Sequence, residues 1–164
     1  MSIESNAWTR GYDPYGTHIE ALAWALAKAP VGPVLELGGC WFSTPLLRGW
    51  CEATGRLLIT AERDEAWRAG LSARFADSDG HHLLPGAPTL DWALVLVDSG
   101  GDTAAGSPRA EAIRLLRDHA AVLVCHDTEP ESRYNYPGME AALAAWPNRR
   151  DFVRLTPQTT VVWA

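Results

Sequence analysis

The stretch Val34-Leu35-Glu36-Leu37-Gly38-Gly39-Cys40-Trp41-Phe42-Ser43-Thr44-Pro45 decides the fold of this chain. Its first four residues form a short, mostly apolar run of the kind that parallel sheets bury on both faces. The two glycines that follow allow a tight turn. Thr44 and Pro45 indicate a helix start, because threonine can cap a helix and proline fits its first position. The stretch therefore predicts a strand, a tight turn and a helix, which together begin a βα unit.

Outward from this stretch, apolar strands alternate with helical segments. Further strands are expected at 57–61, 81–84, 93–97 and 121–125, and helices at 64–76, 107–119 and 138–146. Such alternation produces right-handed βαβ units and a parallel sheet that is covered on both faces. Residues 152–155 and 159–163 are predicted as a final strand pair, and their short connection requires them to be antiparallel. We expect an α/β fold in which strand 34–37 is central, between strands 57–61 and 93–97.

The length of 164 residues is that of one domain, at roughly 100–200 residues per domain. We expect an irregular N-terminal arm at residues 1–16 and a single domain at residues 17–164. Thr17 is predicted to open the first helix of that domain. Thr17 and Glu20 have the spacing of a capping box, in which each side chain accepts a backbone N–H of the other end.

Composition excludes several classes of protein. The chain is 47% hydrophobic and has eight Trp, which is typical of a globular domain and not of a disordered one. Its net charge of −6 argues against a nucleic-acid duplex as partner, because binding one takes clustered cations. No apolar run approaches the roughly 20 residues that a membrane span needs, and no signal peptide is apparent. The three cysteines lack metal-like spacing, so reduced thiols in a cytoplasmic protein are expected.

Acidic side chains stand at the predicted carboxyl ends of several strands, which is the edge where open parallel sheets bind their ligands. They are Glu36, Glu62, Asp98 and, directly after His126, Asp127. Two interpretations remain open. The acids can form a ligand site, or they can simply reflect the preference of acids for loops and helix N-termini.

The loop at residues 38–44 excludes some ligands. A dinucleotide pyrophosphate needs glycine where backbone and phosphate approach closely, and here Trp41 and Phe42 occupy those positions. The sequence also lacks a P-loop. A nucleoside-like ligand without a diphosphate remains, and Glu62 is placed to accept hydrogen bonds from both hydroxyls of a ribose.

These residues resemble a known family. Residues 34–44 are similar to the first motif, of E-x-G-x-G-x-G type, of class I S-adenosylmethionine-dependent methyltransferases. Glu62 matches the acidic residue that the family places after its second strand, and Asp98 matches its fourth-motif position. The resemblance covers about residues 17–164. It implies a small, minimal Rossmann-like domain: a three-layer sandwich with a mostly parallel sheet, the strand order 3-2-1-4-5-7-6 and an antiparallel terminal hairpin.

The resemblance also implies S-adenosylmethionine as the cofactor. Its cofactor-binding positions fall on Glu36, Gly38, Gly39, Cys40, Ser43, Glu62 and Asp98. The sequence departs from the family at two of its glycines, the second and the third, which are replaced by Cys40 and Phe42.

Asp98, His126 and Asp127 are the candidate catalytic residues. A neutral histidine is a competent general base for a hydroxyl group near pH 7. Alternatively, Asp127 caps a turn and His126 is structural. Some O-methyltransferases of this class hold a divalent cation at the same strand ends, and Asp98, Asp102 and Asp127 offer oxygen ligands for one. We nevertheless expect no resident metal.

Two further sets of residues are candidates for a site. Tyr12, Tyr15 and His18 can stack on the adenine or shape the substrate pocket, or they can pack as a hydrophobic staple before Thr17. His81 and His82 have no acid or cysteine at ligand spacing and are expected on the surface or at a strand edge.

The sequence thus predicts a methyltransferase that acts on an oxygen or nitrogen of a small molecule or natural-product intermediate. The alternative is a catalytically silent methyltransferase-like domain that binds a nucleoside or a protein partner, which the missing glycines favour. No nucleic-acid or membrane partner is expected. The substrate pocket should be open, or completed by a second subunit in a homodimer.

Overall fold

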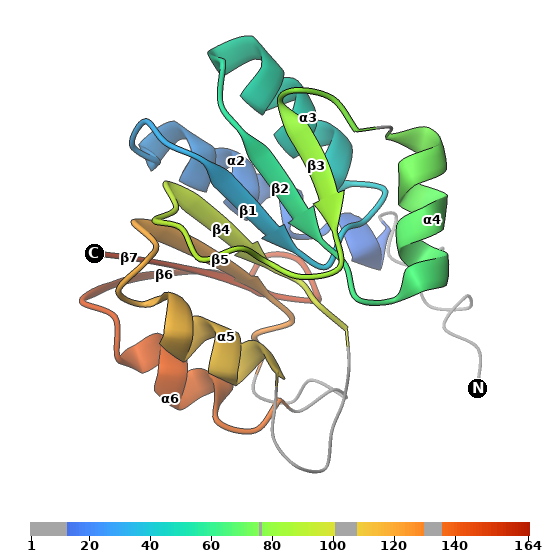
Figure 1. The fold of residues 1–164 in the computed structure, drawn as a ribbon. Helices are drawn as coiled ribbons and strands as arrows, with labels where there is room; N and C mark the ends of the chain where they lie inside the picture. Colours follow the sequence, from blue (N-terminus) through green and yellow to red (C-terminus); the bar gives the residue numbers. More distant parts are fainter. Residues whose placement is uncertain (1–12, 76, 101–107, 130–135) are drawn as a thin grey trace, which may run out of the picture.

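A computed structural model of the chain describes residues 13–75, 77–100, 108–129 and 136–164, and its centre is one seven-stranded sheet (Figure 1). The strand order is β3-β2-β1-β4-β5-β7-β6. The strands are β1 (Val34–Leu37), β2 (Leu58–Ala61), β3 (His81–Leu84), β4 (Leu94–Val97), β5 (Val122–His126), β6 (Asn148–Phe152) and β7 (Thr159–Trp163). This is the Rossmann-like order expected from the sequence.

Strand β1 is central, as predicted, and pairs in parallel with β2 on one side and β4 on the other. Strand β3 extends the parallel part beyond β2, and β5 extends it beyond β4. Strand β7 lies antiparallel between β5 and β6, which confirms the antiparallel terminal hairpin. The carboxyl ends of β1, β2, β4 and β5 therefore meet at one edge of the sheet.

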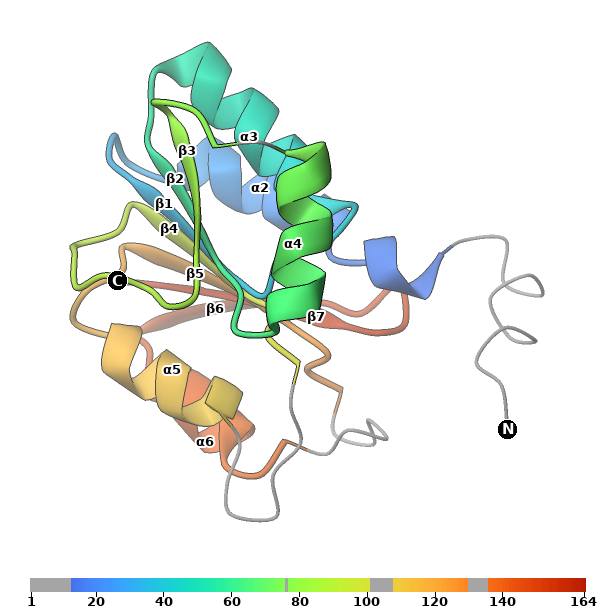
Figure 2. The same cartoon turned by 45° about the vertical axis from the view of Figure 1, so that its right-hand side comes forward.

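Helices cover both faces of the sheet (Figures 1 and 2). They are α2 (Ile19–Lys28), α3 (Ser43–Thr54), α4 (Glu65–Arg74), α5 (Pro108–Leu116) and α6 (Met139–Ala144), preceded by a short 3-10 turn, η1 (Pro14–Gly16). Alternation along β4 shows the two layers: Leu94 and Leu96 pack on the side of α2 and α3, whereas Val95 and Val97 pack on the side of α5 and α6. Helix α4 packs near the β3 edge through Leu71.

The structure corrects two predicted helix starts. Helix α2 begins at Ile19 after an N-cap at His18 that makes no side-chain capping bond, so the capping box at Thr17 does not form. The Thr17 hydroxyl instead donates to the carbonyl of Pro14 and lies 2.8 Å from Nε2 of His126 on β5. Helix α3 begins at Ser43, and the Thr44 hydroxyl donates a hydrogen bond to the buried carboxyl group of Glu36 instead of capping the helix. In both places the threonine hydroxyl contacts a side chain on another element, and does not cap the helix as the sequence spacing predicts.

Two other predictions are also corrected. The strand predicted at residues 152–155 lies at 148–152, because the five residues of β6 pair with β7 before the turn. His81, predicted on the surface or at a strand edge, is on edge strand β3 but its side chain is fully buried. Tyr12 and Asp102 lie outside the described residues. Within the described ranges, no helix has the length and apolar character needed to cross a membrane.

Candidate active site at the carboxyl edge of the sheet

The turn after β1 is held tightly against neighbouring strands. Gly38 has φ +85°, a conformation that favours glycine, and a Cβ there would lie 2.6 Å from the backbone N and Cα of Ser99. A Cβ on Gly39 would lie 2.5 Å from a methyl group of Leu71. Both glycines are therefore required by the packing of the chain itself, and they fix the course of the loop that follows.

Cys40 replaces a glycine of the family pattern and helps to order the start of α3. Its sulfur accepts the backbone N–H groups of Phe42 at 3.4 Å and Ser43 at 3.3 Å, and it contacts the Ser43 hydroxyl at 3.0 Å. Burial raises the pKa of the Cys40 thiol, so it stays protonated. The thiol thus satisfies N–H groups that a helix start leaves free, which gives this departure from the glycine pattern a structural role.

Glu36 lies on β1 with its carboxyl group fully buried and surrounded by hydroxyl groups. Its oxygens accept hydrogen bonds from Ser43 at 2.5 Å, Thr44 at 2.8 Å and Thr60 at 2.7 Å. Burial raises the pKa of Glu36 to about 7, against the opposing effect of these hydrogen bonds. Glu36 therefore ties β1 to α3 and β2, and its position behind the loop makes it a support for the glycine turn.

Replacing Glu36 with glutamine should change how stability depends on pH. The folded chain keeps a proton on Glu36 up to about pH 7, whereas the ordinary pKa is 4.5. The folded state therefore loses stability as pH rises from 4.5 to about 7, because the unfolded chain releases this proton first. The free energy of unfolding should fall by about 3 kcal/mol in total, at 1.36 kcal/mol per pKa unit. Chemical denaturation across this range should show that fall in wild type, and a smaller one in Glu36→Gln. An exposed control, Glu65→Gln, should keep the wild-type slope; equal slopes in all three proteins would contradict the assignment.

Glu62 follows β2 at the same edge and is only partly buried. One carboxylate oxygen accepts the backbone N–H of Asp64 at 2.8 Å, which orients the side chain. The indole N–H of Trp67, from α4, donates to the carbonyl of Gly39 at 2.7 Å and joins this region to the loop after β1. Because the backbone N–H of Gly38 donates to the carbonyl of Ala61, the residue directly before Glu62, Glu62 lies beside the glycine turn.

Asp98, His126 and Asp127 form a connected network on the other side of β1, where β4 and β5 end. His126 Nδ1 lies 3.1 Å from Asp98 Oδ1 and 3.7 Å from Asp127 Oδ1. His126 Nε2 lies 2.8 Å from the hydroxyl of Thr17. The structure therefore brings the three predicted catalytic residues together, and both nitrogens of His126 have partners.

Arg109 is a member of this network that the sequence reasoning missed. It lies in the first turn of α5, is 2% exposed, and pairs with Asp98 at 3.1 Å and with Asp127 at 3.0 Å. Its guanidinium also donates to the carbonyls of His126 and Ser99. The only sequence signal was a cation directly after the predicted helix start Ser107-Pro108, which does not reveal burial.

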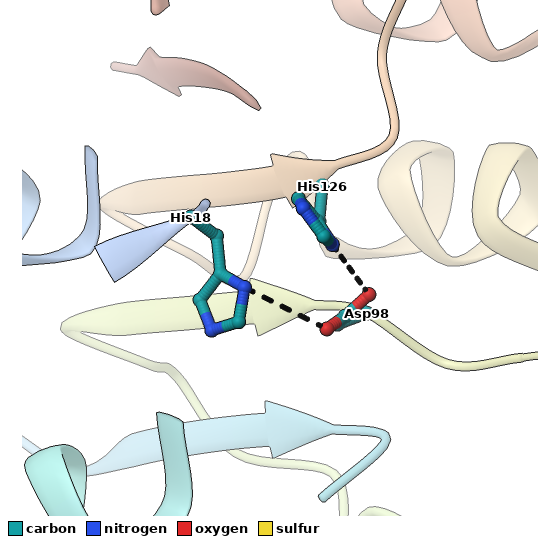
Figure 3. Close-up of side chains that lie close together, drawn as sticks. All are labelled: His18, Asp98 and His126. Atoms are coloured by element: carbon teal, nitrogen blue, oxygen red, sulfur yellow. Dashed lines mark hydrogen bonds and ion pairs between the residues drawn. The ribbon is translucent and has the colours of Figure 1, made fainter. Parts of the chain in front are cut away.

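His18 lies next to the network, at the N-cap of α2 (Figure 3). Its Nδ1 is 4.0 Å from Asp98 Oδ2, and its ring packs edge-on against that of His126, with centroids 4.8 Å apart. Burial lowers the pKa of His18 to about 4. Burial also acts to lower the pKa of His126, but the hydrogen bond and charge of Asp98 outweigh it and raise that pKa above its ordinary value. The two rings are in contact, yet burial favours the neutral form of His18 whereas Asp98 favours the charged form of His126.

Comparison with known proteins gives matches in structure alone: no protein-family model and no curated protein sequence matches the chain. The chain is similar to the "delta-N METTL16 MTase domain", with a TM-score of 0.57, 10% identity, and coverage of 91% of this chain and 82% of that one. It is similar to the selenomethionine-substituted CurJ carbon methyltransferase, with a TM-score of 0.59 and 15% identity, over 90% of this chain and 53% of that one.

A third similar structure is the N-terminal domain of human METTL16 in complex with SAH, with a TM-score of 0.52 and 11% identity. The match covers 90% of this chain and 70% of that one. Identities this low establish the fold and leave the chemistry to be argued from the residues. With its strand order and antiparallel terminal hairpin, this chain has the fold of the class I S-adenosylmethionine-dependent methyltransferases.

Proposed function

We propose that this protein is an S-adenosylmethionine-dependent methyltransferase that acts on an oxygen or nitrogen of a small molecule. The observation that carries the proposal is the pairing of a tight Gly38-Gly39 turn with the Glu62 carboxylate at the carboxyl edge of β1 and β2. An adenosine ligand suits this arrangement, because a carboxylate can accept both hydroxyl hydrogens of a ribose. The loop after the turn carries the bulky Trp41 and Phe42, which suit a ligand without a pyrophosphate.

The acceptor is assigned from charge and from the buried network. The net charge of −6 disfavours a polyanionic substrate. CurJ is named a carbon methyltransferase, but a histidine held by a carboxylate suits an acceptor that gives up a proton on oxygen or nitrogen. We therefore retain a small hydroxyl or amine compound as the substrate class.

Methyl transfer from a sulfonium to such an acceptor is an in-line displacement, and the protein's task is to hold the two reactants in position. In our proposal His126 takes the acceptor's proton through Nε2, and Asp98 orients the ring through Nδ1. The Thr17 hydroxyl lies 2.8 Å from Nε2, so it occupies the position that an acceptor hydroxyl would take. Asp127 contributes by fixing Arg109 and by adding negative charge near the imidazole.

The alternative is a catalytically silent domain, and binding separates it from an enzyme. Cys40 and Phe42 replace two glycines of the family motif. The Cys40 sulfur already accepts backbone N–H groups of its own loop, which favours a structural role for this loop over cofactor binding. Isothermal calorimetry with S-adenosylmethionine and S-adenosylhomocysteine tests this directly. Absence of binding of both ligands favours a silent domain that binds a protein partner, whereas binding of both supports a working cofactor site, and turnover then separates an enzyme from a silent nucleoside-binding domain.

Replacing Glu62 with alanine should weaken S-adenosylmethionine binding by about 1–3 kcal/mol, the usual scale for hydrogen bonds to a charged group. Glu62→Gln, which keeps one carbonyl acceptor and the contact to Asp64, should lose less. Glu65→Ala is the matched control, since Glu65 is exposed on α4 near the same edge. Unchanged affinity in a folded Glu62→Ala protein would show that Glu62 does not hold the ribose.

A further inference from the structure

His18 is the least explained polar side chain in the described part of the structure. It has no solvent-exposed surface, and neither ring nitrogen has a hydrogen-bond partner among the described residues. A buried polar group without a hydrogen-bond partner is unfavourable and calls for an explanation. Because neither nitrogen is engaged, a neutral His18 ring offers a free lone pair. Such a lone pair is what a metal ion needs from histidine.

The surroundings of His18 supply the other ligands (Figure 3). One donor atom from each of His18, Asp98 and His126 can be chosen so that all three lie within 4.8 Å of one another. Nitrogen and oxygen ligands at 2.0–2.1 Å from an ion lie about 3–3.4 Å apart. The separation of 3.1 Å between His126 and Asp98 already meets this range. The separation of 4.0 Å between His18 and Asp98, within a cluster that spans up to 4.8 Å, would have to shorten as the side chains close on an ion.

The groups behind these side chains fit the same interpretation. A metal-bound histidine characteristically has its second nitrogen fixed by an outer hydrogen bond, and the Thr17 hydroxyl occupies that place on His126. Arg109 contacts Oδ1 of Asp98, whereas His18 faces Oδ2. With His126 neutral, the buried network holds two carboxylates against one guanidinium, and the excess negative charge attracts a cation.

We infer that His18, Asp98 and His126 form a binding site for a divalent transition-metal ion of the zinc class. Two imidazoles and one carboxylate suit zinc, iron(II) or cobalt, whereas magnesium and calcium favour oxygen ligands. The ion would replace the proton that His126 shares with Asp98. Three protein ligands leave a coordination position open, and zinc lowers the pKa of a bound water to about 7. In methyl transfer, a consequence that rests on the proposed function, an ion there would activate the acceptor oxygen in place of a protein base.

Metal binding to the protein alone tests this inference independently of methyl transfer. Full-length chain, stripped with chelator, is titrated with Zn²⁺ by calorimetry and with Co²⁺ by visible absorption, and Mg²⁺ serves as the comparison ion. We expect one tightly bound Zn²⁺ or Co²⁺ per chain and no comparable binding of Mg²⁺. His18→Leu should lower the affinity by at least about 10–100-fold, the scale already known for loss of outer-sphere partners. This variant should fold, because it replaces an unpartnered buried imidazole with an apolar side chain.

The matched control is His82→Ala, a histidine that lies outside the cluster on β3 and is only partly buried. It should bind the metal as wild type does. Thr17→Val, which removes only the outer hydrogen bond to His126, should weaken binding by about 10–100-fold. Weak or absent binding by wild type would overturn the inference. So would unchanged affinity in His18→Leu, or a Co²⁺ spectrum with thiolate bands, which would place the ion at a cysteine. These outcomes leave the cofactor-binding test of the proposed function unaffected.

Discussion

Replacing Arg109 with methionine should lower the free energy of unfolding by about 3–5 kcal/mol, the range for breaking a buried ion pair by removing one partner. The guanidinium is buried and pairs with both Asp98 and Asp127, so its loss leaves two carboxylates without their cation. Methionine keeps much of the side-chain volume, which separates the loss of charge from the loss of packing. Chemical denaturation at neutral pH measures the change.

Two further variants make this prediction specific. Arg109→Lys keeps the positive charge but not the forked geometry that reaches several partners, so its loss should be intermediate. Arg114→Met, on the exposed side of the same helix, is the control and should stay within about 0.5 kcal/mol of wild type. If Arg109→Met were as stable as Arg114→Met, the network would not depend on this cation.

Replacing His126 with alanine should lower turnover by about 10²–10⁴-fold, the contribution of a general base, while S-adenosylmethionine binding remains. Only the unprotonated imidazole can accept a proton, and the pKa of His126 is raised above 6.5 by Asp98. Product formation by wild type should therefore rise with pH through a midpoint above 6.5. Single-turnover assays with hydroxyl and amine acceptors, together with calorimetry, separate catalysis from binding.

The control for His126 is His119→Ala, since His119 is an exposed histidine that pairs with Asp91 away from the site. It should turn over as wild type does. Equal turnover in His126→Ala would remove this residue from the mechanism. Loss of cofactor binding in His126→Ala would instead make it a cofactor-site residue.

The sheet was predictable because its signals are local. Runs such as 94–97 and 122–124 are apolar throughout, since both faces of a central parallel strand are buried. Strand β6 was placed wrongly for the converse reason. Its residues are mostly exposed, and Arg149 and Arg150 give no apolar pattern, so only pairing with β7 defines them as a strand.

The candidate site was predictable only in part. The carboxylates at strand ends follow from the geometry of parallel sheets, so Asp98, His126 and Asp127 could be grouped without a structure. Arg109 and His18 could not be added to this group from the sequence, because both lie at helix starts. A histidine at a cap and an arginine in a first turn are common there and give no sign of burial. Thr17 shows why: local spacing assigned its hydroxyl to a helix cap, but a residue 109 positions away competes for it.

The interior position of β7 sets the order in which the sheet can be completed during synthesis. Residues 159–163 are the last strand in chain order, yet they lie between β5 and β6. Until the ribosome has released them, one edge of β5 has no partner and β6 has nothing to pair with. A nascent chain with such an open apolar edge is prone to aggregation and is a natural client for chaperones. However early the βα units fold, the sheet therefore cannot close until residues 159–163 have been synthesised.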